Sequence, residues 1–129
     1  MEEASHMFME KVGAMLMVWL LHAIIAGILS APIVILGRKR VHWHLWELLT
    51  FIIPFALWTA LFFSELSTGR KSLANFGEPN YFALAIPLAA LVRVAVGSRV
   101  SQRVCAIALI GVLSGLAVGI FFIVPSLPE

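Results

Sequence analysis

Three residues with acidic, basic or imidazole side chains lie within the long apolar segments of this chain: His22, Glu47 and Arg93. A charged side chain at the centre of a bilayer costs about 2.5–3.5 kcal/mol on insertion scales, so such residues are rare and mark functional sites by default. An intramembrane histidine can relay protons, contact a quinone, or ligate a metal or haem. Which of these roles is possible depends on the helices that position the three side chains.

For His22, which the sequence places centrally in the membrane, a structural role is the favoured interpretation. A histidine within an apolar helix usually forms a hydrogen bond with Ser, Thr or a carbonyl of a neighbouring helix. A haem held between two histidines of the chain would need a second one at matching depth, whereas His42 and His44 lie at the membrane edge. Cys105 is the only cysteine, which excludes a cysteine-based metal cluster. We therefore predict no cofactor and no metal site.

Glu47 and Arg93 are expected in one layer of the membrane. Glu47 follows Leu45, where the second apolar segment begins, and Arg93 precedes Gly97, where the third ends, by about 6 Å of helix. We predict an ion pair between them across two helices. Separate solvation in the headgroup layer, with the Arg93 side chain reaching toward water, is the alternative.

Four apolar segments dominate the chain, at residues 12–36, 45–63, 81–97 and 104–124. Spanning the hydrocarbon core takes roughly 20 apolar residues, with about 17 to 25 tolerated. Hydrophobic residues make up 61% of the sequence and charged residues only 12%, too apolar for a soluble chain of this size. The sequence predicts an all-α polytopic membrane protein: residues 1–129 form one domain of four transmembrane helices in an up-down bundle.

The distribution of Lys and Arg residues predicts how this bundle is oriented in the membrane. Six of the nine Lys and Arg residues flank the first and third connections, including Arg38, Lys39 and Arg40 after the stop signal of Gly37. Because cytoplasmic loops carry an excess of Lys and Arg, we place loops 37–44 and 98–103 in the cytoplasm and both termini outside. We expect the protein in the inner membrane of a bacterium.

The first connection mixes cations with aromatic residues. Nucleic-acid binding by stacking is one interpretation of such a mixture. Because the segment adjoins two spans, contact with anionic lipid headgroups is favoured instead, and no nucleic-acid partner is expected. The predicted headgroup contacts are Arg38, Lys39, Arg40, Trp43 and Trp46.

The connection at residues 64–80 is predicted to lie outside. Residues 72–76 are expected to form a short helix, and the sequence Glu78-Pro79-Asn80 is typical of a helix start. The segment has polar groups for a ligand or partner, but a plain solvated connection is the favoured interpretation. Its polar residues are Glu65, Arg70, Lys71, Asn75 and Glu78.

The last apolar segment carries small residues at a spacing that puts them on one helix face. They are Ala108, Gly111, Gly115 and Gly119, with a weaker counterpart, Ala23, Gly27 and Ala31, in the first segment. Such a face lets another helix backbone approach closely. Packing within the chain is the simpler interpretation, and a second copy or a different subunit is the alternative.

The sequence contains no phosphate-binding loop, dinucleotide fingerprint or metalloprotease motif, and no nucleophile beside a base. We therefore expect a non-catalytic protein: an accessory or structural subunit of a larger membrane complex, or a homo-oligomer. Two alternatives remain open. One is a small transporter or channel subunit using His22 and the Glu47/Arg93 layer, and the other is a membrane sensor or signalling protein.

Overall fold

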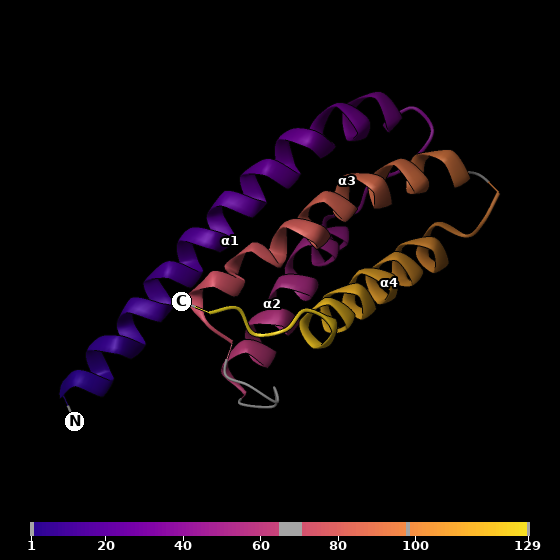
Figure 1. Cartoon of the computed structure of the whole chain (residues 1–129). Coiled ribbons are helices and arrows are strands. Elements are labelled where there is room, and N and C mark those ends of the chain that lie inside the picture. Colours follow the sequence, from indigo (N-terminus) through magenta and orange to yellow (C-terminus); the bar gives the residue numbers. More distant parts are fainter. Residues whose placement is uncertain (1, 65–70, 98, 129) are drawn as a thin grey trace.

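The computed structural model describes residues 2–64, 71–97 and 99–128, and this part of the chain contains helices and no strand. The long helices are α1 (Glu2–Gly37), α2 (Leu49–Phe63), α3 (Pro79–Val96) and α4 (Gln102–Ile123), arranged side by side in Figure 1. A short 3-10 helix, η1 (Leu45–Leu48), leads into α2, and a second, η2 (Leu73–Gly77), leads into α3. The predicted all-α four-helix bundle is confirmed.

All four helical segments are long and apolar enough to cross a membrane. Their outward surfaces carry large apolar side chains that water would not tolerate in such number; Leu16 is 66% exposed and Val112 is 67% exposed. The chain is therefore a small integral membrane protein.

The first helix is longer than the sequence predicted. It begins at Glu2 rather than at residue 12, and at 1.5 Å per residue it is about 54 Å long, against about 30 Å for the hydrocarbon core. The first ten residues contain good helix formers and no proline, so the helix continues through them. This N-terminal part extends past the rest of the bundle (Figure 1), with the ring of Phe8 6.0 Å from that of Phe63.

The main packing partners are not neighbours in sequence. α1 packs mainly on α3, and α2 packs mainly on α4. The core between them is rich in aromatic side chains, with Phe55 and Phe82 edge to face at 4.8 Å and Trp58 fully buried. This leaves α1 and α4 as opposite edges of the bundle (Figure 1).

The helices end where the sequence predicts. Gly37 ends α1 beside α3, where a Cβ atom would collide with the Val94 side chain, so only glycine fits. Gly97 ends α3 with φ of +35°, a conformation that favours glycine. Pro79 begins α3, where its missing N–H costs nothing.

The small residues of α4 face outward. A Cβ atom added to Gly111, Gly115 or Gly119 would meet nothing within 4 Å. At 100° per residue this face lies opposite the buried residues Leu113 and Ala117. Packing of the glycine face within the chain, the simpler interpretation of the sequence, is therefore wrong, because α4 uses its other side to pack on α2.

Candidate functional site

An ion pair between Glu47 and Arg93 lies at the end of the bundle where α1 and α3 terminate. The guanidinium Nε donates to Oε2 at 3.2 Å, and Nη2 donates to Oε1 at 3.3 Å. Both side chains are buried, at 8% and 2% exposure for the two residues. Two parallel N–H groups bonded to one carboxylate fix the orientation of the guanidinium and also neutralise its charge. The predicted pairing is present, and separate solvation of the two charges is wrong.

The first connection folds back over this pair. The backbone N–H of His44 donates to Glu47 Oε1 at 3.2 Å, which holds the start of η1 against the carboxylate. The Trp43 ring lies 5.9 Å from the guanidinium carbon of Arg93, within the range of a cation–π contact. Trp43 was predicted to face lipid headgroups; its indole nitrogen is instead buried beside the pair. Arg38, Lys39 and Arg40 are exposed, as a headgroup contact requires.

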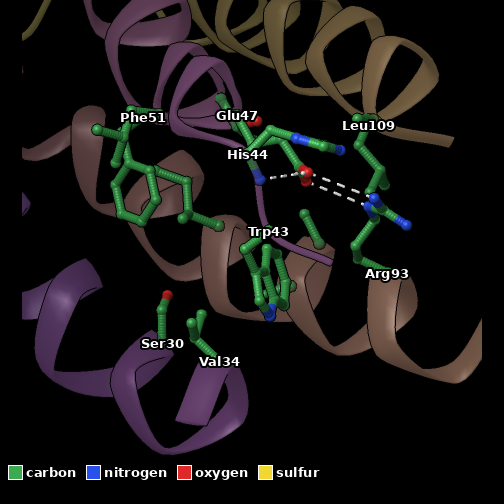
Figure 2. A pocket seen from close by; sticks show the side chains of 14 residues that line it. Ser30, Val34, Trp43, His44, Glu47, Phe51, Arg93 and Leu109 are labelled. Carbon is green, nitrogen blue, oxygen red and sulfur yellow. Dashed lines mark hydrogen bonds and ion pairs between the residues drawn. The ribbon is translucent and has the colours of Figure 1, made fainter. Parts of the chain in front are cut away.

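A cavity of about 160 Å³ lies beside the ion pair, between all four long helices (Figure 2). Its wall is mainly apolar, with Phe51 and Ile86 among its larger side chains. Polar side chains enter it from three directions: Ser30 from α1, Glu47 from η1 and Arg93 from α3. We call this space the Arg93 cavity.

Three buried polar atoms on residues that line the Arg93 cavity have no hydrogen-bond partner within the described residues. They are Ser30 Oγ, Trp43 Nε1 and Arg93 Nη1. Most buried polar groups in proteins are paired, so three unpaired atoms on the residues around one cavity need an explanation. The cavity is therefore the candidate functional site.

No known family matches. Comparison of the chain with protein families, with curated proteins and with solved structures finds no match in any of the three. In the residues described here, no group of three or more His, Cys, Asp or Glu side chains is placed to hold a metal ion.

His22 is engaged at both ring nitrogens. Nδ1 lies 2.6 Å from the carbonyl oxygen of Val18, and Nε2 lies 2.7 Å from Asn80 Oδ1 at the start of α3. Two acceptors facing two ring nitrogens favour a histidine held in place by its neighbours, in agreement with the structural interpretation. Because Asn80 belongs to the first turn of α3, His22 lies near that end of the bundle and not at its middle.

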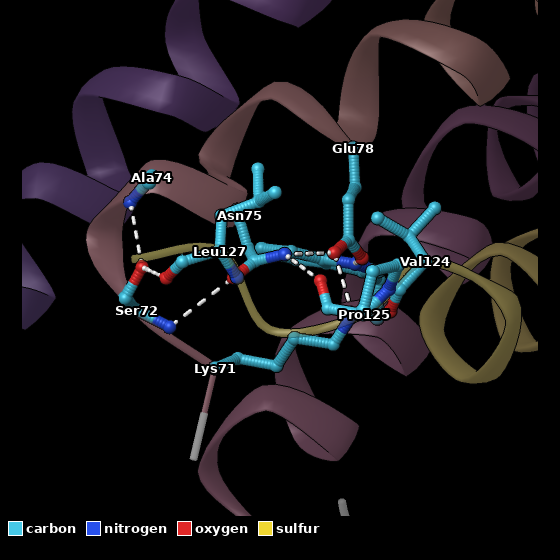
Figure 3. Close-up of polar contacts among 9 residues, drawn as sticks. Lys71, Ser72, Ala74, Asn75, Glu78, Val124, Pro125 and Leu127 are labelled. Atoms are coloured by element: carbon cyan, nitrogen blue, oxygen red, sulfur yellow. Dashed lines mark hydrogen bonds and ion pairs between the residues drawn. The ribbon is translucent and has the colours of Figure 1, made fainter. Parts of the chain in front are cut away.

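A second polar cluster (Figure 3) lies at the start of α3, whereas Arg93 lies in the last turn of that helix. Lys71 Nζ donates to Glu78 Oε1 at 2.6 Å, and Trp58 Nε1 of α2 donates to Glu78 Oε2 at 2.9 Å. Asn75 uses its whole side-chain capacity: Nδ2 donates to Glu78 and to the Pro125 carbonyl, and Oδ1 accepts from the N–H groups of Ser72 and Leu127. We call these residues the Glu78 cluster.

The Glu78 cluster corrects the prediction of a solvated connection. Lys71, Asn75 and Glu78 are all buried and bind one another, and Lys71 and Asn75 also bind the C-terminal segment after α4. The short helix expected at residues 72–76 is confirmed as η2. Glu65 and Arg70 lie outside the described residues.

Sequence reasoning found the ion pair but missed most of the cavity. Ser30 gave no signal, because serine is common in membrane helices and bonds its own backbone there. Trp43 was assigned to the surface from its place beside three cations. The C-terminal partners of Asn75 are backbone groups, which no side-chain pattern reveals.

Proposed function

We propose that this protein acts by assembly: copies join edge to edge in the membrane and form a structural element of a larger membrane complex. The observation that carries the proposal is the outward face of α4, where Gly111, Gly115 and Gly119 leave the backbone uncovered. No catalytic step is part of this role.

A glycine face is unusual on a surface that meets only lipid. Association of helices in lipid depends on close backbone approach, so small residues gather where two helices meet, whereas lipid contact needs no small residues. The rest of the outward surface of α4 follows the lipid pattern, with large exposed side chains at Ile107 and Ile123. The glycine face is thus suited to another helix.

A second copy of the chain supplies a matching helix. On α1, Ala23 and Ala31 are exposed, and a Cβ atom on Gly27 would meet nothing within 4 Å. Ser30 of α1 and Leu109 of α4 line the same cavity, so they lie at similar depth. The two helices run in opposite directions in the bundle.

Toward the Asn80 end of the bundle, the small residues of the two helices lie at levels that differ by about one residue. Three residues before Ser30 is Gly27, and two residues after Leu109 is Gly111. Another turn along each helix brings Ala23 close to the level of Gly115. The small face of α1 in one copy therefore fits the glycine face of α4 in the next, at nearly the same depth in the membrane.

Such a contact joins different surfaces of the two partners. Because α1 and α4 are opposite edges of the bundle, each copy can bind one neighbour through α4 and another through α1. Contacts of this kind close into rings when the rotation permits. All copies share one orientation in the membrane, so the axis of the ring would be perpendicular to the membrane plane.

Replacement of Gly115 by leucine tests the assembly. Gly115→Leu should shift the protein, purified in mild detergent, from oligomer to monomer in size-exclusion chromatography with light scattering. Ala56→Leu is the matched control, because Ala56 is exposed on α2 away from both small faces. An unchanged mass for Gly115→Leu would overturn the proposal.

Cysteine cross-linking tests the partner face. In a Cys105→Ala background, Gly27→Cys and Gly111→Cys should cross-link when the two variants are co-expressed in one membrane. Cross-linking of Gly111→Cys with itself would show α4 against α4 and contradict the edge-to-edge arrangement.

The orientation expected from the cations is part of the same proposal. We place loops 37–44 and 98–103 in the cytoplasm, both termini outside, and the assembly in a bacterial inner membrane. What supports this is the concentration of Arg and Lys at one end of the bundle, with Arg38, Lys39 and Arg40 exposed there.

A further inference from the structure

The Arg93 cavity is separate from the faces used in assembly, and its unpaired atoms share one chemical property. Trp43 Nε1 is a donor only, Arg93 Nη1 carries only donor hydrogens, and Ser30 Oγ can donate. A molecule in the cavity must therefore offer acceptor oxygens. A ligand that brought further N–H groups would leave these donors unsatisfied.

The ion pair decides the charge of that molecule. Glu47 neutralises Arg93 at 3.2 Å, so the wall of the cavity carries one charge of each sign. An anion would bring a net negative charge into a poorly solvated space. Because the Glu47–Arg93 pair has no net charge, it would not offset the free-energy cost of burying that anion. A neutral acceptor, such as a carbonyl oxygen, incurs no such cost.

The size and wall of the cavity limit the rest of the molecule. A volume of about 160 Å³ is close to that of an apolar cavity known to hold one benzene ring, about 150 Å³. Phe51 and the Trp43 indole provide flat apolar surface (Figure 2), and alanines 89, 90 and 106 keep the space open. The ligand is thus an apolar group of ring size that carries a carbonyl.

We propose that the Arg93 cavity binds a neutral, carbonyl-bearing membrane molecule, with the carbonyl oxygen accepting from Ser30 Oγ. Two membrane components have this chemistry: the ring of a lipid-soluble quinone, and the acyl ester of a phospholipid. The cavity lies within the bundle at the level of the helix ends, where both are accessible from the bilayer.

Titration with ubiquinone-1 tests this site. The full-length protein is reconstituted in nanodiscs of a diether phosphatidylcholine, which has no ester carbonyl, and quenching of tryptophan fluorescence is followed. Quenching that saturates shows a site, whereas quinone dissolved in the lipid quenches without saturation. Ser30→Ala removes one donor and should weaken binding about three- to tenfold, the effect of one neutral hydrogen bond.

Two further variants make the result specific. Val34→Phe, on the cavity wall, should abolish saturable quenching by filling the space. Ser114→Ala is the matched control, because the Ser114 hydroxyl bonds the Ile110 carbonyl and lies outside the cavity, and it should bind as the wild type does. If Ser30→Ala binds as Ser114→Ala does, or if no saturable quenching is seen, the proposal is overturned.

A repeat in nanodiscs of the diester lipid separates the two sources. Equal affinity in both lipids identifies the quinone ring as the occupant. At least tenfold weaker quinone binding in the diester lipid means that the ester carbonyl competes for the same donor, which assigns the cavity to a phospholipid. Both results support carbonyl recognition.

Discussion

Lys71 and Glu78 form an ion pair of 2.6 Å in which each side chain is only 3% exposed. The same carboxylate accepts hydrogen bonds from Trp58 at 2.9 Å and from Asn75 at 2.7 Å. The Glu78 carboxylate therefore connects η2 and the start of α3 to Trp58, a fully buried residue of α2. Each charge of the pair is stabilised only by the groups bonded to it. Removal of one charge therefore leaves the other without compensation in a low-dielectric interior.

Removal of the Lys71 charge should destabilise the protein. Lys71→Met leaves Glu78 buried without its cation, and breaking such a pair costs about 3–5 kcal/mol. Thermal unfolding in detergent, followed by circular dichroism, measures the loss. The double variant Lys71→Met with Glu78→Gln should recover part of it. Unchanged unfolding of Lys71→Met would contradict the role assigned to this pair.

Asn75 should hold the C-terminal segment in place. Asn75→Ala removes both contacts to Pro125 and Leu127, so the Leu127 amide should exchange its hydrogen faster in hydrogen–deuterium exchange. Ser126→Ala, at an exposed position of the same segment, is the control and should leave the exchange rate unchanged. Equal protection in both variants would mean that the segment is held by other contacts.

Reversal of one charge of the Glu47–Arg93 pair should be severely destabilising. Arg93→Glu places two carboxylates together in a buried site, and we expect a loss of at least about 3 kcal/mol in thermal unfolding. The swapped variant, Glu47→Arg with Arg93→Glu, should regain part of the stability. Arg99→Glu is the surface control, because Arg99 is exposed. A swap no better than the single change would show that the pairing does not matter.

The orientation can be read from cysteine labelling in intact cells. In a Cys105→Ala background, Ser126→Cys should react with a membrane-impermeant maleimide, because the C-terminal segment is expected outside. Lys39→Cys should react only after the membrane is permeabilised, since the cation-rich first connection is expected in the cytoplasm. Reversed labelling of the two positions would reverse the orientation.

The spans and the ion pair could be predicted because they depend on local properties of the chain. Hydropathy identifies segments that satisfy their own backbone hydrogen bonds in lipid, and Pro79 and Gly37 mark the helix ends. Glu47 and Arg93 were paired by depth alone, which follows from counting residues along two helices.

The pairing of helices and the buried clusters could not be predicted in this way. α1 prefers α3 to its sequence neighbour α2 because of side-chain shape on both, such as the close fit of Gly37 on Val94. Lys71 and Glu78 look solvated in the sequence, since burial of a charge depends on partners far along the chain, including the Val124 carbonyl. The Arg93 cavity is space left between four helices, and no segment encodes it alone.

The partnership of α1 with α3 has a consequence for biosynthesis. α1 ends at Gly37 and α3 begins at Pro79, so 41 residues lie between them. The ribosome therefore delivers α1 and the connection after it to the membrane well before the main partner of α1 exists. During that interval α1 must persist as an independent helix in lipid, which its long apolar segment at residues 12–36 allows. Insertion and folding of this protein are thus separate events in time, and the second waits for translation to pass the end of α3.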